Sequence, residues 1–493
     1  MGEPSGRRLA TAVTQRASRS LAARAVLALA LFVGFYAMGA TLVLGLLWVP
    51  WAQAHYGHEL QLGGMVCGAF ALWIAFALLP RFPTGRPPVE PAAPTDAHAR
   101  LRALIGETAR AIGEPVPEEL YVLASVNAFA GRRGGVLGLG GRRMIGIGLP
   151  LLSALEEDEV RAVIAHELGH HHAGDLFLGP WVRRTHMAVA VALARLEGAS
   201  FVLHMPFALY ARLFLRLTRR ASREQELAAD AIARRVAGAD ATARALIGVD
   251  RLAPRWGAYF HGEVVPLLNG GHRPPLLDGF RRFLAEPVHR ADVREAIARA
   301  DDEAPHESDT HPPLSERLAS LEADRITRPP PASSALGLLD SVERAEHDAL
   351  DVVLLPNHPP LKPIGWDAAG EAWVAMWRAR LRNEPRLAAA TIEALPQLVD
   401  DWEAATQRQP GISLLSTEGK RKRVCDLIGC RLAVALADSG FRIETPPGAE
   451  TRATKGDRTI EPEALVRKLA SGEIDASAFR RVLGDAGALS GSQ

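Results

Sequence analysis

The sequence lacks a charge excess of either sign and has few cysteines, and both features exclude classes of protein. Its 57 Lys and Arg residues nearly balance 56 Asp and Glu residues, so the net charge is +1. Without a large basic field, we expect no nucleic-acid partner. Cys67 lies in an apolar run, and Cys425 and Cys430 are spaced to fall on different faces of a predicted helix. The cysteines therefore favour reduced thiols and predict neither a disulfide nor a CxxC metal site.

Charged residues are also absent from two long apolar runs near the N-terminus. The runs cover residues 25–49 and 62–80, and a membrane-spanning helix needs about 20 apolar residues. Arginines flank the pair on both outer sides, whereas the connector between the runs contains no Lys or Arg. By the positive-inside rule, this pattern predicts a transmembrane hairpin over residues 1–80 whose two ends face the cytosol. The alternative is a mitochondrial transit peptide, of which an Arg-rich, acid-poor start is also typical.

A proline-rich segment separates this hairpin from the rest of the chain. Residues 81–95 contain five prolines, which predict a stiff, extended linker. Beyond the linker, apolar spacing predicts an amphipathic helix from Asp96, and strand-like stretches follow. We therefore expect an α+β, mostly helical fold, with one domain over residues 96–327 and a linker plus a helical domain over residues 328–493.

A helix with a well-defined start follows the predicted strands. Ser153 and Glu156 have the spacing of a capping box, and the acidic residues at 157–159 suit the positive end of a helix dipole. The next apolar residues recur at helical spacing, so we expect this helix to bury one face.

The same helix carries the stretch HELGHHH, which has the pattern of a metal site. His166 and His170 are four residues apart, so both imidazoles lie on one helix face and can bind one ion. Glu167 is adjacent to His166 and can act as a general base on a molecule bound at that ion. His171 and His172 point away from this face, and we expect them to be solvated or to support the site indirectly. HExxH is the pattern of two zinc ligands and a general base.

A catalytic zinc ion usually has three protein ligands and one position open for water. No third histidine follows His170 closely enough for the metzincin pattern. A carboxylate is the other option, and the predicted helix over residues 222–238 offers Glu226 and, as a rival, Glu224. Asp230 lies one turn after Glu226 and could orient a zinc-bound histidine through its second ring nitrogen.

Four blocks of the sequence resemble a known family of membrane zinc peptidases, which includes the CAAX prenyl endopeptidase and the HtpX heat-shock protease. The resemblance covers about residues 96–324. Its blocks are NAFAG, EEDEVRAVIAHELGHHHAGD, SREQELAAD and THPPLSERLASLEA.

This resemblance implies a zincin-type metallopeptidase domain of the gluzincin class, with one Zn²⁺ per chain. It implies His166, His170 and Glu226 as zinc ligands and Glu167 as the general base. It also favours Glu226 over Glu224, because the family's ExxxD pattern matches Glu226 and Asp230.

The resemblance further implies how a peptide or protein substrate is held. Asn127 and Ala128 match an edge strand along which the substrate backbone is bound by strand addition. His311 and Arg317 match the late HPPxxxR block. Either could stabilise the oxyanion of the tetrahedral intermediate. The equal alternative is structural, with His311 capping a helix and Arg317 forming an ion pair.

The chain departs from the family between the second histidine and the third ligand. Integral members insert two membrane spans there, whereas the apolar insertion at residues 185–217 is interrupted by charged residues. We expect a helical hairpin at the membrane interface. A chamber of many spans is then absent, which favours membrane-protein quality control or a stress response over CAAX-type prenyl-protein processing.

Residues 328–493 show no catalytic pattern, and we expect them to gate the site, bind a protein partner or select substrates. Two functions of different classes therefore follow from the sequence. One is a zinc endopeptidase in the cell membrane, multi-pass, with its peptidase domain on the cytoplasmic side and the lipid bilayer as a partner. The other is a membrane scaffold whose zinc site only stabilises the fold. Three ligands plus an unliganded Glu167 favour the enzyme, because structural zinc sites are normally closed by four ligands.

Overall fold

The structure is a computed structural model, and the chain in it divides into two compact units. Unit 1 comprises Met1–Asp250 and Ala304–Val342, and unit 2 comprises Arg251–Glu303 and Glu343–Gln493. Residues 251–303, which the sequence placed in the domain over 96–327, thus group with the C-terminal segment. The residues described are 5–56, 61–78, 91–133, 141–172, 189, 201–302, 312–321, 333–354, 358–402 and 417–488.

Unit 1 contains a four-stranded sheet made of β1 (Ala92–Thr95), β2 (Glu119–Leu123), β3 (Ala128–Arg133) and β4 (Arg142–Gly148). The strand order is β1-β2-β4-β3. β2 and β4 are parallel, whereas β1 and β3 pair antiparallel with their neighbours. β1 and β3 are therefore the two edges of the sheet. The first of these edges lies in the segment that the sequence predicted as a linker.

The helix after the sheet begins differently from the sequence prediction. α5 spans Glu157–His172, whereas Ser153 lies inside the preceding helix α4 (Leu149–Ala154) and donates a hydrogen bond to a main-chain carbonyl of that helix. The N–H of Glu156 instead donates to the Glu159 carboxylate at 2.9 Å. The predicted capping box of Ser153 with Glu156 is therefore wrong. The side chain that accepts a hydrogen bond from the start of α5 is therefore that of Glu159, three residues after Glu156.

A single long helix joins two regions that the sequence treated separately. α7 runs without interruption over Phe201–Ala237. It therefore contains both the end of the apolar insertion and the carboxylate-bearing segment 222–238. Within residues 185–200 the structure describes Val189 alone, so the first arm of the predicted hairpin lies outside the described residues.

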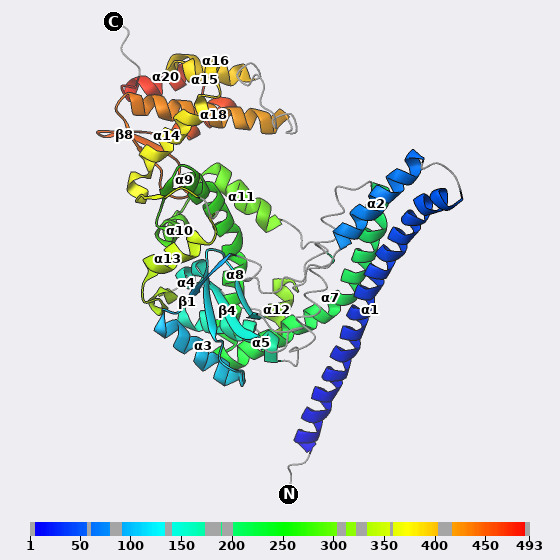
Figure 1. Cartoon of the computed structure of the whole chain (residues 1–493). Helices are drawn as coiled ribbons and strands as arrows, with labels where there is room; N and C mark the ends of the chain where they lie inside the picture. Colours follow the sequence, from blue (N-terminus) through cyan, green and yellow to red (C-terminus); the bar gives the residue numbers. More distant parts are fainter. Residues whose placement is uncertain are drawn as a thin grey trace. The chain divides into compact units, whose positions relative to one another are not determined.

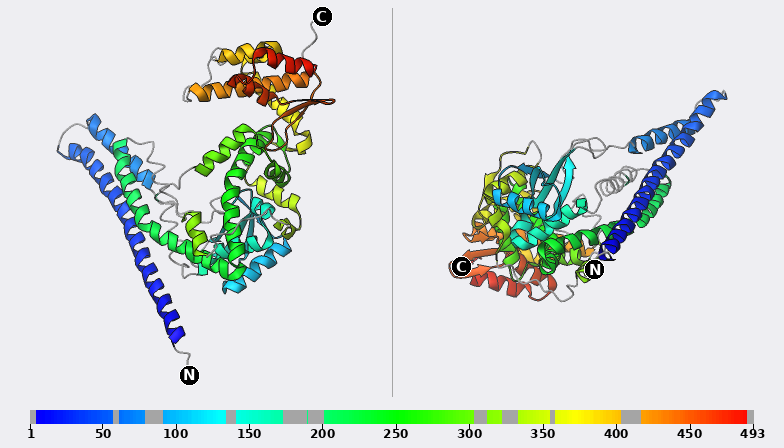
Figure 2. Two further views of the ribbon diagram at one scale, coloured as in Figure 1. Left: turned by 180° about the vertical axis from the view of Figure 1, so that it is seen from behind. Right: turned by 90° about the horizontal axis from the view of Figure 1, so that it is seen from below.

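The N-terminal half of α7 packs against the first two helices of the chain. α1 spans Ser5–His55 and α2 spans Leu62–Leu78, and the three helices lie side by side in Figures 1 and 2. The Tyr210 hydroxyl donates to the Leu31 carbonyl at 2.8 Å. Their shared core contains Phe35, Ile74, Ala77, Leu78, Val189, Phe207, Ala211 and Phe214.

Much apolar surface of α1 stays exposed in this packing, including Trp48 and Trp51. Of the described residues, Leu29–His55 form one helix that is long and apolar enough to cross a membrane, whereas α2 is shorter. The transmembrane hairpin of two spans therefore stays a prediction. The remaining elements of unit 1 are α3 (Ala99–Ile112), the part of α8 (Ala239–Tyr259) up to Asp250, α12 (Leu314–Ser320) and η2 (Ala335–Leu338).

Unit 2 is also mostly helical, but it contains a small antiparallel sheet of β7, β8 and β9 that the sequence did not predict. Its core is built on α18, whose buried face includes Leu427, Ile428 and Leu432. Its elements are η1 (Phe260–Val264), α9 (Val265–Asn269), β5 (His272–Arg273), α10 (Leu276–Ala285), α11 (Ala291–Asp302), α13 (Val342–Asp351), β6 (Lys362–Pro363), η3 (Trp366–Ala368), α14 (Ala369–Leu381), α15 (Pro385–Ala389), η4 (Ile392–Ala394), α16 (Leu395–Asp400), α18 (Thr417–Asp438), β7 (Arg442–Glu444), β8 (Arg452–Lys455), β9 (Arg458–Ile460), α19 (Pro462–Ser471) and α20 (Ala476–Asp485).

Candidate active site

The two histidines of the HELGH stretch project from α5 toward α7. They are one helical turn apart, and their ring centroids are 4.8 Å from each other. α5 is held at its start by Arg244 of α8, which contacts Asp158 at 2.7 Å and Glu159 at 3.3 Å. The acidic residues of the first turn therefore lie at the positive end of the helix dipole, and two of them are also paired with Arg244.

A glycine permits the close approach of α5 and α7. A Cβ atom at Gly169 would lie 3.3 Å from the Ile232 side chain and 3.4 Å from the Ala229 Cα atom, both on α7. These are tight contacts, so a larger residue would push the helices apart. Gly169 lies between His166 and His170 in the sequence. It thereby allows the carboxylates of α7 to approach both histidines.

The carboxylate of Glu226 lies against both imidazoles. Its Oε2 atom is 3.5 Å from His166 Nε2, and its Oε1 atom is 3.6 Å from His170 Nε2. Glu226 is 6% exposed, whereas Glu224, the rival ligand, is exposed. The structure therefore brings Glu226 and not Glu224 to the histidine pair.

These three side chains have the donor set and spacing of a metal site. One ligand atom from each of His166, His170 and Glu226 lies within 4.8 Å of the others, and no second such group of His, Cys, Asp or Glu occurs among the described residues. Ligands at about 2.0–2.2 Å from a tetrahedral ion lie roughly 3.4 Å apart. The nitrogen–oxygen distances of 3.5 and 3.6 Å are close to this value. The residues therefore fit a metal ion.

Asp230 occupies the other nitrogen of His166. Its Oδ1 atom is 3.0 Å from His166 Nδ1, and the side chain is fully buried. A hydrogen bond at Nδ1 fixes the ring and leaves Nε2 facing Glu226. Carboxylates often orient metal-binding histidines in this manner.

Arg317 of α12 completes the group. Its guanidinium donates to Asp230 through Nε at 2.8 Å and through Nη2 at 2.6 Å. The sequence left open whether Arg317 acts on the reaction or forms an ion pair, and the structure has this ion pair. We call His166, Glu167, His170, Glu226, Asp230 and Arg317 the histidine cluster.

The charges of the histidine cluster shift the pKa values of its members. Burial lowers the pKa of His166, but hydrogen bonds with Asp230 and Glu226 and the charge of Glu167 outweigh it and raise the pKa to about 9. Burial raises the pKa of Asp230, but hydrogen bonds with Arg317 and His166 leave it below its usual value. Without a metal, the group thus holds a proton on His166 in neutral solution, and a metal ion would have to displace it.

The other residues named from the sequence fall in different places. Ala128 is the first residue of the edge strand β3, and Asn127 immediately precedes it. The Asn127 carbonyl accepts a hydrogen bond from Gly148 N–H at 2.8 Å, which ties this corner to β4. α5 packs beside β3. His311 and the side chains of His171 and His172 lie outside the described residues.

Comparison with known proteins agrees with this geometry. Residues 96–325 match the family model described as peptidase family M48. This segment of the chain is thus similar to the peptidases of family M48. M48 peptidases are metal-dependent, so the comparisons support a metallopeptidase and, with His166, His170 and Glu226, a place where its metal could bind.

A curated relative supports the same assignment of the M48 segment. The chain is similar to a protein named "Protease HtpX homolog" from Archaeoglobus fulgidus, with 26% identity over 250 residues. The match covers 46% of this chain and 68% of that protein. No solved structure matches the chain.

Sequence reasoning missed the role of Gly169. The signal was present, because a glycine inside a predicted helix costs about 1 kcal/mol relative to alanine and often marks close packing. The pairing of Asp230 with Arg317 had no comparable signal. The two residues are 87 positions apart, and no spacing in the sequence links one to the other.

Proposed function

We propose that this protein is a membrane-anchored, zinc-dependent endopeptidase of the gluzincin type. The observation that carries the proposal is the convergence of His166, His170 and Glu226, with ligand atoms within 4.8 Å of one another. His166 Nε2, His170 Nε2 and the Glu226 carboxylate would hold the ion. When bound, zinc lowers the pKa of a bound water to about 7 and polarises the substrate carbonyl.

Glu167 is proposed to act as the general base. It adjoins His166 on α5 and is partly exposed, so its carboxylate can reach a water bound at the ion. Its carboxylate would accept a proton from the attacking water and pass it to the leaving amine. General-base catalysis of this kind typically contributes a factor of about 100 to 10,000.

The substrate is proposed to bind as an extended strand along β3. This strand is an edge of the sheet, and α5 packs beside it. Asn127 and Ala128 stand at the start of β3, where main-chain groups could pair with a peptide backbone. Binding through the main chain would give affinity with little choice of sequence, which suits the removal of damaged proteins.

The location of the reaction is proposed from the apolar helices. The exposed apolar side chains of α1, among them Trp48 and Trp51, favour contact with lipid. The arginines on the outer flanks of residues 25–49 and 62–80 favour a cytoplasmic peptidase domain. We therefore place the enzyme in the cell membrane, with a role in membrane-protein quality control.

The proposal is tested with Glu167→Gln in the full-length protein. Glutamine keeps the shape and the hydrogen-bonding capacity of the side chain but cannot accept the proton. Cleavage of an unfolded model substrate should fall by about 100- to 10,000-fold, while metal content measured by mass spectrometry stays at the parent level. Glu224→Gln, an exposed neighbour of the ligand, is the matched control and should cleave like the parent.

The outcome also separates the enzyme from the scaffold alternative. A scaffold with a structural zinc would show no cleavage in the parent and no difference between the two variants. Loss of metal from Glu167→Gln would show that Glu167 is a ligand or a support, and the proposed general base would then be wrong.

A further inference from the structure

Arg317 contacts members of the histidine cluster besides its ion-pair partner Asp230. Its fork binds both oxygens of Asp230, at 2.8 and 2.6 Å. Its Nη2 atom also lies 3.5 Å from His166 Nδ1 and 3.9 Å from Glu226 Oε2. One guanidinium thus adjoins two of the three candidate ligands as well as the carboxylate that orients one of them.

Asp230 lies between Arg317 and His166 and contacts both. Asp230 Oδ1 accepts from Arg317 at 2.6 Å and lies 3.0 Å from His166 Nδ1. A carboxylate on a single hydrogen bond can rotate about its terminal torsion. The two parallel bonds of an Arg–carboxylate fork fix the plane of the carboxylate. Arg317 therefore fixes the position of Asp230 Oδ1. The contact of this atom with His166 Nδ1 in turn fixes the orientation of the imidazole ring.

The charge balance of the cluster depends on Arg317 as well. The cluster contains three carboxylates, those of Glu167, Glu226 and Asp230, and one permanent cation, Arg317. With both imidazoles neutral, two negative charges are left, which a divalent ion would balance. A guanidinium stays charged in proteins, so this contribution is fixed.

Among the residues that the structure describes, α12 has few other contacts that hold Arg317 in place. The helix has seven residues, and none of its side chains is fully buried. Leu318 and Leu321 pack against Ala243 of α8. Arg223 of α7 and Glu316 of α12 form a second ion pair at 3.8 Å, in which both side chains are more than 40% exposed. The Arg317 fork is thus the buried polar contact between α12 and the cluster.

We propose that Arg317 is a positioning residue for the metal site, which acts through Asp230 to hold the His166 ring in its ligating orientation. The inference rests on the proposed function in that the cluster must bind a metal. In this proposal α12 stabilises α5 and α7, the two helices that carry the ligands, without providing a ligand itself. The planar fork, and not the positive charge alone, carries this role.

The test measures metal binding and needs no substrate. Full-length protein is loaded with Co²⁺, whose visible absorption reports the ligand geometry, and the rate of metal loss to a chelator is recorded. Arg317→Ala should change the Co²⁺ spectrum and speed metal loss by about 10- to 100-fold, the usual effect of losing such a support. Arg317→Lys keeps the charge but not the fork, so it should resemble Arg317→Ala.

Arg223→Ala is the matched control, because it removes the other ion pair between α7 and α12. Its spectrum and its rate of metal loss should stay within about twofold of the parent, as expected for an exposed pair. Thermal unfolding of the metal-free proteins shows whether each variant is folded. If Arg317→Ala does not fold, Arg317→Lys carries the test.

A double-mutant cycle tests the route through Asp230. If Arg317 acts through Asp230, adding Arg317→Ala to Asp230→Ala should speed metal loss by less than twofold, because the two effects are not additive. A parent spectrum in Arg317→Ala, full recovery in Arg317→Lys, or additive effects would overturn the inference. Failure of the parent to bind Co²⁺ or Zn²⁺ would instead overturn the proposed function.

Discussion

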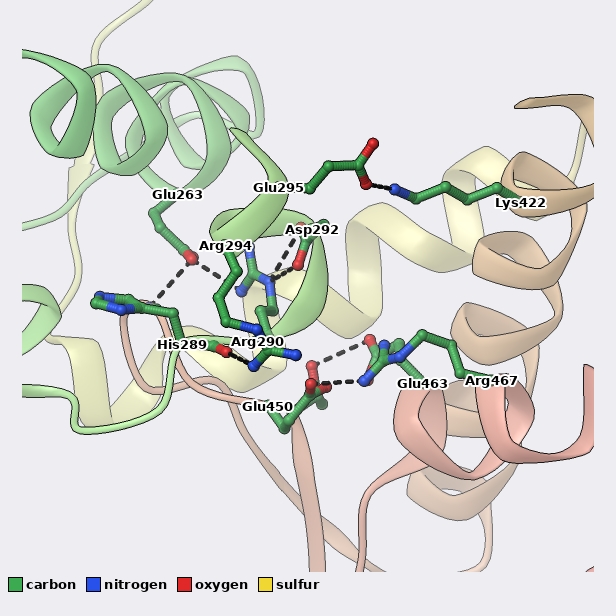
Figure 3. Close-up of polar contacts among 12 residues, drawn as sticks. Glu263, His289, Arg290, Asp292, Arg294, Glu295, Lys422, Glu450, Glu463 and Arg467 are labelled. Atoms are coloured by element: carbon green, nitrogen blue, oxygen red, sulfur yellow. Dashed lines mark hydrogen bonds and ion pairs between the residues drawn. The ribbon is translucent and has the colours of Figure 1, made fainter. Parts of the chain in front are cut away.

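The two units each contain a group of charged side chains with buried members, and the groups differ in how their charges are balanced. The histidine cluster of unit 1 has three carboxylates and one permanent cation. The corresponding group in unit 2, shown in Figure 3, has four carboxylates and four cations besides Glu463. We call it the unit 2 cluster. Its members are Glu263, Arg290, Asp292, Arg294, Glu295, Lys422, Glu450, Glu463 and Arg467.

Each carboxylate of the unit 2 cluster has a partner within the chain. Arg290 contacts Glu263 at 2.8 Å and Asp292 at 2.9 Å, and Arg467 contacts Glu450 at 2.5 Å. Glu463 accepts a hydrogen bond from the Thr451 hydroxyl at 3.0 Å, and burial raises its pKa. Such a compensated group joins segments of the fold and offers no place for an ion.

The histidine cluster differs in composition as well as in charge. Its imidazoles and the Glu226 carboxylate converge on one point, and two negative charges are left over once both imidazoles are neutral, as metal binding requires. An uncompensated group of this kind is costly to bury unless a ligand completes it. The difference teaches that an excess of charge, and not burial of charge itself, distinguishes the candidate metal site from a structural joint.

The largest effect of a single substitution is expected in the unit 2 cluster. Arg290→Ala would leave Glu263, which is 1% exposed, without its cation. Breaking a buried pair in this way typically costs about 3–5 kcal/mol of unfolding free energy. Denaturant unfolding should show this loss, while the metal content of the folded protein stays unchanged.

Arg281→Ala serves as the control for that variant, because Arg281 and Asp278 form an exposed pair. Its cost should be within about 1 kcal/mol. A change of metal content in folded Arg290→Ala protein would contradict the structural role of the unit 2 cluster. It would make this cluster part of the metal site.

A smaller effect is expected from a substitution that alters the packing beside the histidine cluster and leaves its charges unchanged. Gly169→Ala adds a methyl group against Ile232 and Ala229, at 3.3–3.4 Å. Overpacking of this kind typically costs about 1–3 kcal/mol, of which helix propensity returns up to about 1 kcal/mol, and the shift of α7 should weaken metal binding. Metal affinity measured by competition with a chelator, alongside denaturant unfolding, checks both effects.

Gly257→Ala is the matched control, since a Cβ at this helical glycine meets nothing within 4 Å. It should stabilise the protein by up to about 1 kcal/mol through helix propensity, without altering metal affinity. Equal metal affinity in Gly169→Ala and the parent would mean that the helix pair tolerates separation, and that the glycine does not set the site.

The local parts of the candidate site could be predicted from the sequence, because they depend on helical spacing. His166, Glu167 and His170 lie within one turn and a half of a helix, so their relation is fixed once the helix is recognised. Glu226 needed more, since spacing alone allowed Glu224, and the choice between them came from the resemblance to a family. The structure separates the two by burial.

The parts that depend on distant contacts could not be predicted. Arg317 and Asp230 meet only because α12 folds back onto α7, and no periodicity marks this contact. The continuity of α7 was missed for a different reason. Arg212 and Arg216 interrupt the apolar run and argue against a membrane span, but arginine is a good helix former and does not end a helix.

The start of α5 shows the same limit at short range. Ser153 and Glu156 have the spacing of a capping box, but the chain is extended at Leu155, so that α4 ends there. Spacing alone does not reveal where one helix stops and the next begins. Strands β7, β8 and β9 of unit 2 were missed because each has only three or four residues, too few for an alternating pattern to stand out.

The central claim is that the histidine cluster binds one divalent metal ion through His166, His170 and Glu226. The most direct test is the zinc content of full-length Glu226→Ala, Glu224→Ala and parent protein, measured by mass spectrometry after purification without chelator. We expect about one zinc per chain in the parent and in Glu224→Ala, and nearly none in Glu226→Ala. Parent-like zinc in Glu226→Ala, or an equal loss in Glu224→Ala, would contradict it.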